Sequence, residues 1–382
     1  MRPNAKQLEI SNALDVAAVE RVLAELWQNN ADEVTDEAGA MLRARALNFM
    51  AFLPAEAELA LAHEAIAELT SSHPCRALVM VGEKQKPDRD IEIFVSAFCE
   101  ASAPTRDLQL CCEEVVLIAR GRYVVELASA AAPLLVTDLP VFLWWRDGLL
   151  IEDKLFSLLV RASDRLIIDS NESEDPGADF SGMVHLFRQT ALSDLNWTRL
   201  NTWRTSLANF YDVAELRASL DAVSRVRLDY TAQESHPEGI SPQALLIGGW
   251  LASRLDWTLA DTQSLKEHNG RLAFSFLKGD RQITLELTRV ANPGINPGRL
   301  VRVELEASGE DQAHFDVRRS EDGSHLQTRV RVGSVTHPGR VLPLRNQSMA
   351  QLLSSELEIL TRDRVFEDVV RMVVRMMRVG AS

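Results

Sequence analysis

Two tryptophans and two arginines near the middle of the chain are the residues best suited to bind another molecule. Trp197, Arg199, Trp203 and Arg204 fall within eight positions, in a chain that has seven tryptophans among 382 residues. Tryptophan and arginine dominate the energetics of protein interfaces, so the cluster predicts an anchor for a partner protein. The alternative is that the aromatic side chains are buried where two domains of the chain meet, because large aromatic side chains tend toward burial.

A second cluster of the same residue types ends an apolar run. Trp144, Trp145 and Arg146 follow directly on Val141-Phe142-Leu143, which reads as a short buried strand. The end of this strand is therefore the second candidate for contact with a partner.

The spacing of the central cluster predicts the element that carries it. We expect Ser193 or Asp194 to cap a helix. Trp203, Leu207 and Phe210 then fall at positions i, i+4 and i+7 and form an apolar stripe, and the two arginines lie off it.

The common signatures of enzymes and cofactor sites are missing from the sequence. There is no GxGxxG after a strand pattern, no GxxxxGK[ST], no GxSxG and no HExxH. Gly248 and Gly249 lie inside a helical pattern, where close helix packing explains them better than phosphate binding. We therefore predict no catalytic residue and no bound cofactor.

The cysteines do not predict a metal site. His73 and Cys75 lie close in sequence, but a zinc site needs three or four ligands, and none of the four cysteines forms a CxxC pair. Cys111 and Cys112 are adjacent in a strand pattern, where a disulfide would be strained. Reduced, buried thiols are the expectation, as in a reducing compartment.

Three aspartates near the ends of predicted strands offer an alternative, small-molecule site. Asp138, Asp147 and Asp164 lie where α/β proteins bind ligands, outside the carboxyl ends of the strands. The simpler interpretation is that they are loop carboxylates that cap backbone N–H groups.

Composition restricts the function classes further. The chain is 46% hydrophobic and 25% charged, with a formal net charge of −14 and a pI near 5.1. An acidic chain repels a phosphate backbone, which argues against general nucleic-acid binding. No apolar run approaches the roughly 18 residues that a membrane span needs, and the N-terminus lacks a secretory h-region, so we expect a cytoplasmic protein.

The first half of the chain alternates short strands with helices. This pattern predicts a mostly parallel sheet flanked by helices. We expect strands at 43–52, 76–82, 91–99, 108–118, 141–145 and 165–169, and helices at 14–27, 55–70, 122–132 and 152–161.

In the second half the apolar period changes to two. Five runs with turn residues between them predict an antiparallel sheet of about five strands, at 272–276, 283–287, 301–305, 313–317 and 326–332. Helices are expected at 213–220, 241–257, 351–360 and 365–378, and a further strand at 223–230.

The fold class is thus α/β in the first half and α+β in the second. The acidic, turn-rich stretch 170–178 predicts a boundary. We expect an N-terminal helix and leader at 1–35, an α/β domain at 36–170, a linker and central helical region at 171–235, and the antiparallel sheet with its helices at 236–382.

Four blocks in the same order resemble one family. They are His73-Pro74-Cys75-Arg76, the run 139–145 (LPVFLWW), the run 194–204 (DLNWTRLNTWR) and the run 249–257 (GWLASRLDW). Together they resemble the glucose-6-phosphate dehydrogenase assembly proteins (OpcA) over most of the chain.

The resemblance implies a non-catalytic, two-part protein that binds oligomeric glucose-6-phosphate dehydrogenase. It would promote assembly or the active conformation of that enzyme, as an allosteric activator in the oxidative pentose phosphate pathway of carbohydrate metabolism. Cyanobacterial members carry C-terminal cysteines tied to thioredoxin control, and this chain departs from them because it has no cysteine after Cys112. The main alternative is an α/β protein that binds or processes a sugar phosphate or nucleotide.

Overall fold

A computed structural model describes most of the chain. The described residues are 6–8, 16–33, 40–43, 45–70, 72–101, 108–232, 239–260, 271–292, 294–309, 312–359 and 361–379. Most of the predicted leader, residues 1–5 and 9–15, lies outside them. The chain forms two compact units, and each is assembled from three stretches: 1–168, 186–195 and 347–362 in the first unit, and 169–185, 196–346 and 363–382 in the second. The four-segment division therefore stays a prediction.

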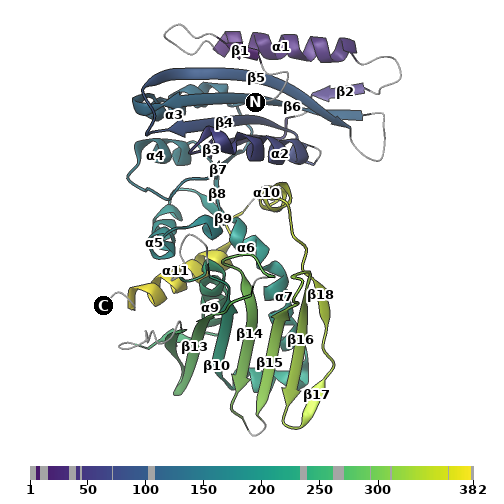
Figure 1. Ribbon diagram of the computed structural model, residues 1–382, viewed down its shortest axis with the longest axis vertical. Coiled ribbons are helices and arrows are strands. Elements are labelled where there is room, and N and C mark those ends of the chain that lie inside the picture. Colours follow the sequence, from purple (N-terminus) through teal and green to yellow (C-terminus); the bar gives the residue numbers. More distant parts are fainter. Residues whose placement is uncertain are drawn as a thin grey trace. The chain divides into compact units, whose positions relative to one another are not determined.

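The first unit is built on a nine-stranded, mostly parallel sheet (Figure 1). Its strand order is β1-β5-β6-β4-β3-β7-β8-β9, and β2 pairs with β6. Among the described strand pairs of this sheet, only β1–β5 and β5–β6 are antiparallel. The strands are β1 (Lys6–Leu8), β2 (Ala40–Arg43), β3 (Leu47–Leu53), β4 (Cys75–Glu83), β5 (Arg89–Ala101), β6 (Leu108–Arg120), β7 (Val141–Trp145), β8 (Arg165–Ile168) and β9 (Ala191–Asp194).

Burial explains why the central strands read as continuous apolar runs. Every residue of β3 and β4 is buried, as expected for parallel strands covered on both faces. One large cluster of buried side chains joins these strands to α2 (Leu59–Thr70) and α10 (Met349–Leu357). The other helices of the unit are α1 (Val16–Glu33), α3 (Leu127–Ala131) and α4 (Lys154–Arg161), with 3-10 turns η1 (Glu56–Glu58), η2 (Gly121–Glu126) and η3 (Ala132–Leu134).

The predicted α-helix at 122–132 is wrong over its first part, which forms a 3-10 helix. Residues 122–132 were expected to be α-helical, but η2 occupies the first part and only the five residues of α3 are α-helical. Pro133 lies in the 3-10 turn that follows, where its missing N–H removes a helical hydrogen bond.

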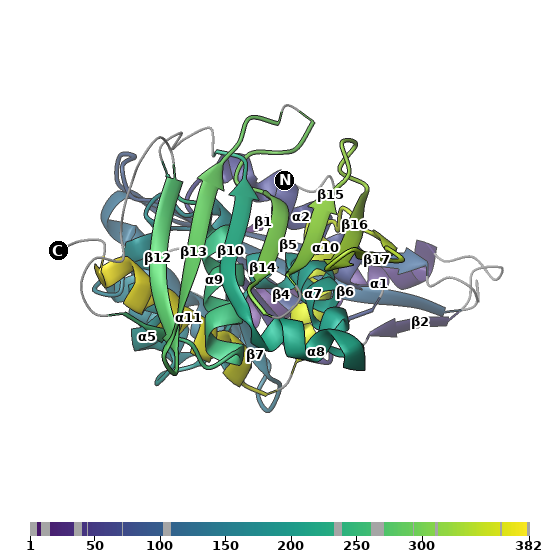
Figure 2. The same cartoon turned by 90° about the horizontal axis from the view of Figure 1, so that it is seen from below.

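The second unit is built on another nine-stranded sheet, of mixed direction (Figures 1 and 2). Its order is β11-β12-β13-β10-β14-β15-β16-β17, and β18 pairs with β16. The strands are β10 (Val223–Tyr230), β11 (Thr258–Leu259), β12 (Arg271–Lys278), β13 (Arg281–Arg289), β14 (Leu300–Ala307), β15 (Ala313–Arg319), β16 (His325–Val332), β17 (Val335–His337) and β18 (Val341–Pro343).

The prediction of about five antiparallel strands is therefore corrected. All five predicted strands are present, but β10 lies between β13 and β14 and runs parallel to β13. Val226, Leu228 and Tyr230 on β10 are buried, so the strand completes the apolar face of the sheet. β11, β17 and β18 have two or three residues each, too few for a period to be read.

Helices of the second unit pack closely because of two glycines. A Cβ at Gly248 would lie 2.8 Å from Leu285 of the sheet, and a Cβ at Gly249 would lie 2.8 Å from Val373. Gly248 and Gly249 therefore let α9 (Pro242–Arg254) approach both the sheet and α11 (Arg364–Val379), which confirms the packing interpretation. The other helices are α5 (Pro176–Leu186), α6 (Leu195–Arg199), α7 (Asn201–Tyr211) and α8 (Ala214–Asp221).

The stretch predicted to be an acidic linker is partly regular. Residues 170–172 form the 3-10 turn η4, and α5 starts at Pro176. In the part of the chain that the structure describes, no helix combines the length and the apolar character required to cross a membrane.

Candidate partner-binding site

The central cluster lies on α6 and α7, and its apolar stripe is confirmed. Trp203, Leu207 and Phe210 are all buried, with Trp203 only 1% exposed. The stripe packs inside the second unit, where Phe210 contacts Phe315 of β15 with ring centroids 5.4 Å apart. The helix therefore uses this face for the core.

Trp197 is fixed on three sides by its own unit. Its indole is 4% exposed, and its Nε1–H donates to Oδ2 of Asp363 at 3.0 Å. The ring lies against Phe366, with centroids 5.8 Å apart, and the Arg204 guanidinium stacks 3.4 Å above it. The arginine thus covers the indole, a cation–π contact that holds both side chains in place.

Arg199 forms an ion pair with a buried carboxylate. Its two terminal nitrogens donate to the two oxygens of Asp169 at 2.6 and 2.7 Å, a bidentate pair whose carboxylate is only 4% exposed. The structure thus places all four central residues in contacts within the unit. Their direct binding to a partner stays a prediction, and a positioning role is what their burial favours.

The second cluster is also built into a core, that of the first unit. Trp144 is fully buried and Trp145 is 2% exposed, stacked on Phe52 with centroids 4.1 Å apart. Arg146 pairs with Glu58 at 2.6 Å and lies over the Trp144 ring. A contact role for these three residues likewise stays a prediction.

The block that begins at His73 contains a buried ion network that the sequence analysis missed. Arg76 is 3% exposed and donates to Glu113 from Nε at 2.9 Å and from Nη2 at 2.7 Å. Arg45 reaches the other oxygen of Glu113 at 2.6 Å, and Glu20 pairs with Arg76 from α1. The sequence did contain a signal for this network. Arg76 and Glu113 lie inside two runs that read as buried strands, and buried charges need partners.

This network sets the charge state of Glu113. Burial alone would raise the pKa of its carboxyl, but the bonds to Arg45 and Arg76 outweigh burial and lower the pKa to about 2. Glu113 is thus a permanent anion at neutral pH, and the network is structural.

The thiols of this block are buried and free of disulfides. Cys75 and Cys112 lie in the core of the first unit with sulfurs 3.7 Å apart, which confirms the prediction for these two. The side chains of Cys99 and Cys111 lie outside the described residues. Among the residues that are described, no group of three or more His, Cys, Asp or Glu side chains could hold a metal ion.

Two of the three aspartates considered for a small-molecule site bond to backbone. Asp164 accepts from the N–H of Val141 at 2.8 Å, and Asp147 accepts from the N–H of Gly148 at 2.8 Å. Asp138 has a positive φ of 66°, a turn conformation that aspartate tolerates better than most residues. These roles fit the capping interpretation.

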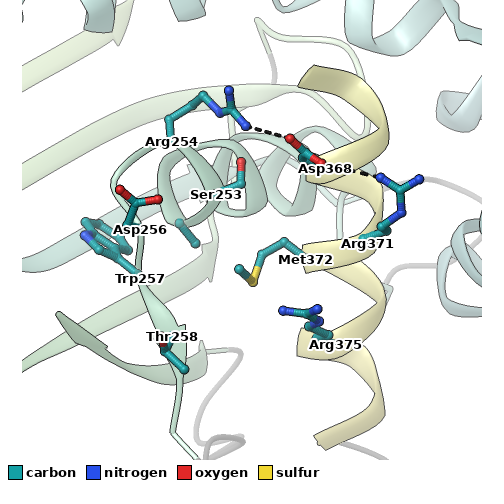
Figure 3. A pocket seen from close by; sticks show the side chains of 10 residues that line it. Ser253, Arg254, Asp256, Trp257, Thr258, Asp368, Arg371, Met372 and Arg375 are labelled. Carbon is teal, nitrogen blue, oxygen red and sulfur yellow. Dashed lines mark hydrogen bonds and ion pairs between the residues drawn. The ribbon is translucent and has the colours of Figure 1, made fainter. Parts of the chain in front are cut away.

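A groove in the second unit brings cationic and apolar side chains together (Figure 3). It has a volume of about 340 Å³ and lies between the C-terminal end of α9 and α11. Arg254 and Arg371 both pair with Asp368, at 2.8 and 3.4 Å, whereas the exposed Arg375 extends along the groove (Figure 3). The largely buried Met372 contributes to its apolar lining.

The groove is lined in part by one of the four sequence blocks described above, the run 249–257. Asp256 has a positive φ of 55° at the turn that ends α9 and leads to Trp257, whose ring packs on Phe276. This turn orients the block so that its tryptophan enters the core while Arg254 and Asp256 line the groove. An open groove lined by both charged and apolar side chains suits a protein surface better than a buried reaction centre.

Comparison with known proteins decides the family. Residues 66–185 match the family model described as the glucose-6-phosphate dehydrogenase subunit N-terminal domain, and residues 190–370 match the corresponding C-terminal domain model. The chain belongs to the OpcA family. The resemblance inferred from four sequence blocks is thereby confirmed.

Members of the OpcA family from cyanobacteria are among the similar proteins. A Nostoc punctiforme protein provisionally named OxPP cycle protein OpcA is 29% identical over 310 residues, which cover 79% of this chain and 64% of that protein. A Synechococcus elongatus protein of the same name is 28% identical, covering 81% of this chain and 69% of that protein. The chain thus spans about two thirds of the length of these relatives.

Solved structures resemble the OpcA-family chain only at the level of the backbone. An NAD binding oxidoreductase from Klebsiella pneumoniae has a TM-score of 0.48 at 11% identity, covering 89% of this chain and 97% of that one. An oxidoreductase from Bacillus cereus has a TM-score of 0.46 at 9% identity, covering 88% and 96%. Similarity this low supports no statement about chemistry.

Proposed function

We propose that this protein is a non-catalytic assembly factor and activator of oligomeric glucose-6-phosphate dehydrogenase in the oxidative pentose phosphate pathway. The observation that supports the proposal is that both halves of the chain match family models described as domains of a glucose-6-phosphate dehydrogenase subunit. The names of the cyanobacterial relatives refer to the same cycle. The absence of enzyme motifs from the sequence is consistent with a partner that performs the chemistry.

Activation by such a protein requires differential binding. An activator shifts an enzyme toward its active state only as far as it binds that state more tightly than the inactive one. By linkage, the substrate then strengthens binding of the activator by the same factor.

The groove between α9 and α11 is the contact surface that we propose for the dehydrogenase. Arg375 is exposed there, and arginine is enriched in protein interfaces. The central cluster that was predicted as a contact would act behind this surface. Trp197 donates to Asp363, the residue that precedes α11 and accepts from the N–H of Phe366 at 2.9 Å.

The test is to add the purified protein to glucose-6-phosphate dehydrogenase from the same cell. NADP reduction and oligomer mass are followed together as the protein is titrated. The proposal predicts faster reduction, larger oligomers, or both, and no turnover by the protein alone. Turnover of a substrate by this chain alone, or unchanged kinetics and mass at saturation, would contradict it.

A further inference from the structure

A chain of buried hydrogen bonds joins four segments of the second unit, namely α9 and the starts of β14, α6 and η4. Gln243, in the first turn of α9 and 2% exposed, accepts from the N–H of Leu300 at 2.9 Å and donates to Oδ1 of Asn196 at 2.8 Å. Asn196 is fully buried and donates in turn to Oγ of Ser170 at 3.1 Å. The starts of β14, α6 and η4 are therefore fixed next to one another.

The starts of β14, α6 and η4 each carry a charged residue close to the residue that forms the hydrogen bond. Arg299 precedes Leu300, Arg199 lies one helical turn after Asn196, and Asp169 precedes Ser170. A fourth charge joins them from β15, because the Nε–H of Arg319 donates to the carbonyl oxygen of Leu300 at 3.1 Å. The fold thus gathers three arginines and one aspartate.

Among the residues that the structure describes, the charges in this cluster do not balance. Asp169 gives both of its carboxylate oxygens to Arg199. Burial, together with the nearby Arg199, lowers the pKa of Arg299 to about 10 even though Asp169 opposes the change. Burial and the neighbouring Arg299 lower the pKa of Arg319 to about 10 as well. Arg299 and Arg319 therefore repel each other inside a chain whose net charge is −14.

The partial burial of the three arginines favours a small anion over a folded partner. The side chains of all three arginines are partly buried, and that of Arg199 is 16% exposed. A folded partner would contact side chains that project from the surface, whereas a small group can enter between partly buried ones. The planar fork of a guanidinium matches the oxygens of a phosphate group and donates to two of them at once.

We propose that Arg199, Arg299 and Arg319 bind the phosphate group of a small phosphorylated ligand. Asp169 holds Arg199 in place, and Arg299 and Arg319 supply the uncompensated positive charge that the phosphate neutralises. This site is separate from the α9–α11 groove, and it does not depend on the proposed interaction with the dehydrogenase. Binding at this site would stabilise the second unit, because the ligand relieves the repulsion between the arginines.

The test uses the full chain without any partner. Calorimetric titration and thermal unfolding are measured with inorganic phosphate, with glucose 6-phosphate, with glucose, and with sodium chloride at matched ionic strength. The variants are Arg299→Gln and Arg319→Gln, and the matched control is Arg318→Gln, because Arg318 is the exposed neighbour of Arg319 on the same strand. Both cluster variants are expected to fold, since each removes a repelling charge.

We expect both phosphate compounds to bind the wild-type chain and Arg318→Gln and to raise Tm, while glucose and sodium chloride do not. Each cluster variant should weaken phosphate binding roughly tenfold or more, the usual size of a lost hydrogen bond to a charged group. Tighter binding of glucose 6-phosphate than of inorganic phosphate would identify a sugar phosphate as the ligand class, and equal binding would identify phosphate alone. Equal phosphate affinity in wild type and both cluster variants, or no effect of phosphate beyond that of sodium chloride, would overturn the proposal.

Discussion

Individual buried charges in the first unit are neutralised within the fold, and Glu113 shows this most directly. Its carboxylate is 1% exposed and receives hydrogen bonds from both Arg45 and Arg76. Removing one member of a buried pair leaves the other charge without compensation, which costs more than the pair itself contributes.

Glu113→Gln is therefore expected to lower the free energy of unfolding by about 3 kcal/mol at neutral pH. The folded pKa of Glu113 is about 2, below the value of 4.5 expected without the fold. Its stabilisation is therefore complete above pH 4.5 and is lost as the pH falls toward 2. Urea unfolding of both proteins at a series of pH values measures the difference, which should shrink on acidification.

Glu152→Gln is the matched control, because Glu152 is an exposed carboxylate of the same unit. Its effect should stay within about 0.5 kcal/mol. A similar loss of unfolding free energy in both variants would show that the network does not stabilise the fold. A loss in Glu113→Gln that does not change with pH would show the same.

At the residue scale, the sequence predicted a cluster of tryptophan and arginine side chains but not where they point. The structure places Trp197 and Arg199 in contacts within the second unit, and their role in partner binding stays a prediction. Their partners, Asp363 and Asp169, are 166 and 30 positions away, and no local spacing reveals such pairs. Residue type alone therefore could not distinguish a contact surface from a core.

At the scale of elements, the packing of α9 on α11 depends on a glycine. Gly249→Ala would place a Cβ 2.8 Å from Cγ2 of Val373 and 3.1 Å from the carbonyl oxygen of Val369. Alanine favours a helix by about 1 kcal/mol over glycine, but forcing the helices apart costs about 1 to 3 kcal/mol. We expect a net loss of about 1 kcal/mol, measured by urea unfolding.

Shortening the side chain of Val373 tests whether its contact with residue 249 causes this loss of stability. Adding Val373→Ala to Gly249→Ala should cost at least about 1 kcal/mol less than the sum of the two single changes, since they share one contact. Gly148→Ala is the control, because nothing lies within 4 Å of a Cβ there. Strict additivity of the two changes would contradict the packing account.

Most elements could be predicted because each has a clear local period. The alternation in β12 to β16 and the apolar runs of β3 and β4 placed these strands correctly. The insertion of β10 between β13 and β14 could not be predicted in the same way. It depends on pairing with residues roughly 60 to 80 positions away in sequence, and local patterns report only which face is buried.

For the whole molecule, the groove between α9 and α11 is the proposed contact with the dehydrogenase. Arg375→Glu reverses an exposed charge within it, and we expect the affinity for the dehydrogenase to fall roughly tenfold. Arg378→Glu is the matched control, because it makes the same change on an exposed residue in the last turn of α11, outside the groove lining. Interferometry at two salt concentrations measures the affinity of both variants for the dehydrogenase. An equal loss of affinity in Arg375→Glu and Arg378→Glu would argue against the groove as the contact surface.

The proposed function requires that this chain contribute binding energy to the active form of another enzyme. The most direct measurement is its affinity for glucose-6-phosphate dehydrogenase with and without glucose 6-phosphate present, set beside the affinity of the dehydrogenase for that substrate with and without this chain. Linkage predicts that the two affinities rise by the same factor. If the chain binds with one affinity in both conditions, or does not bind at all, the account is contradicted.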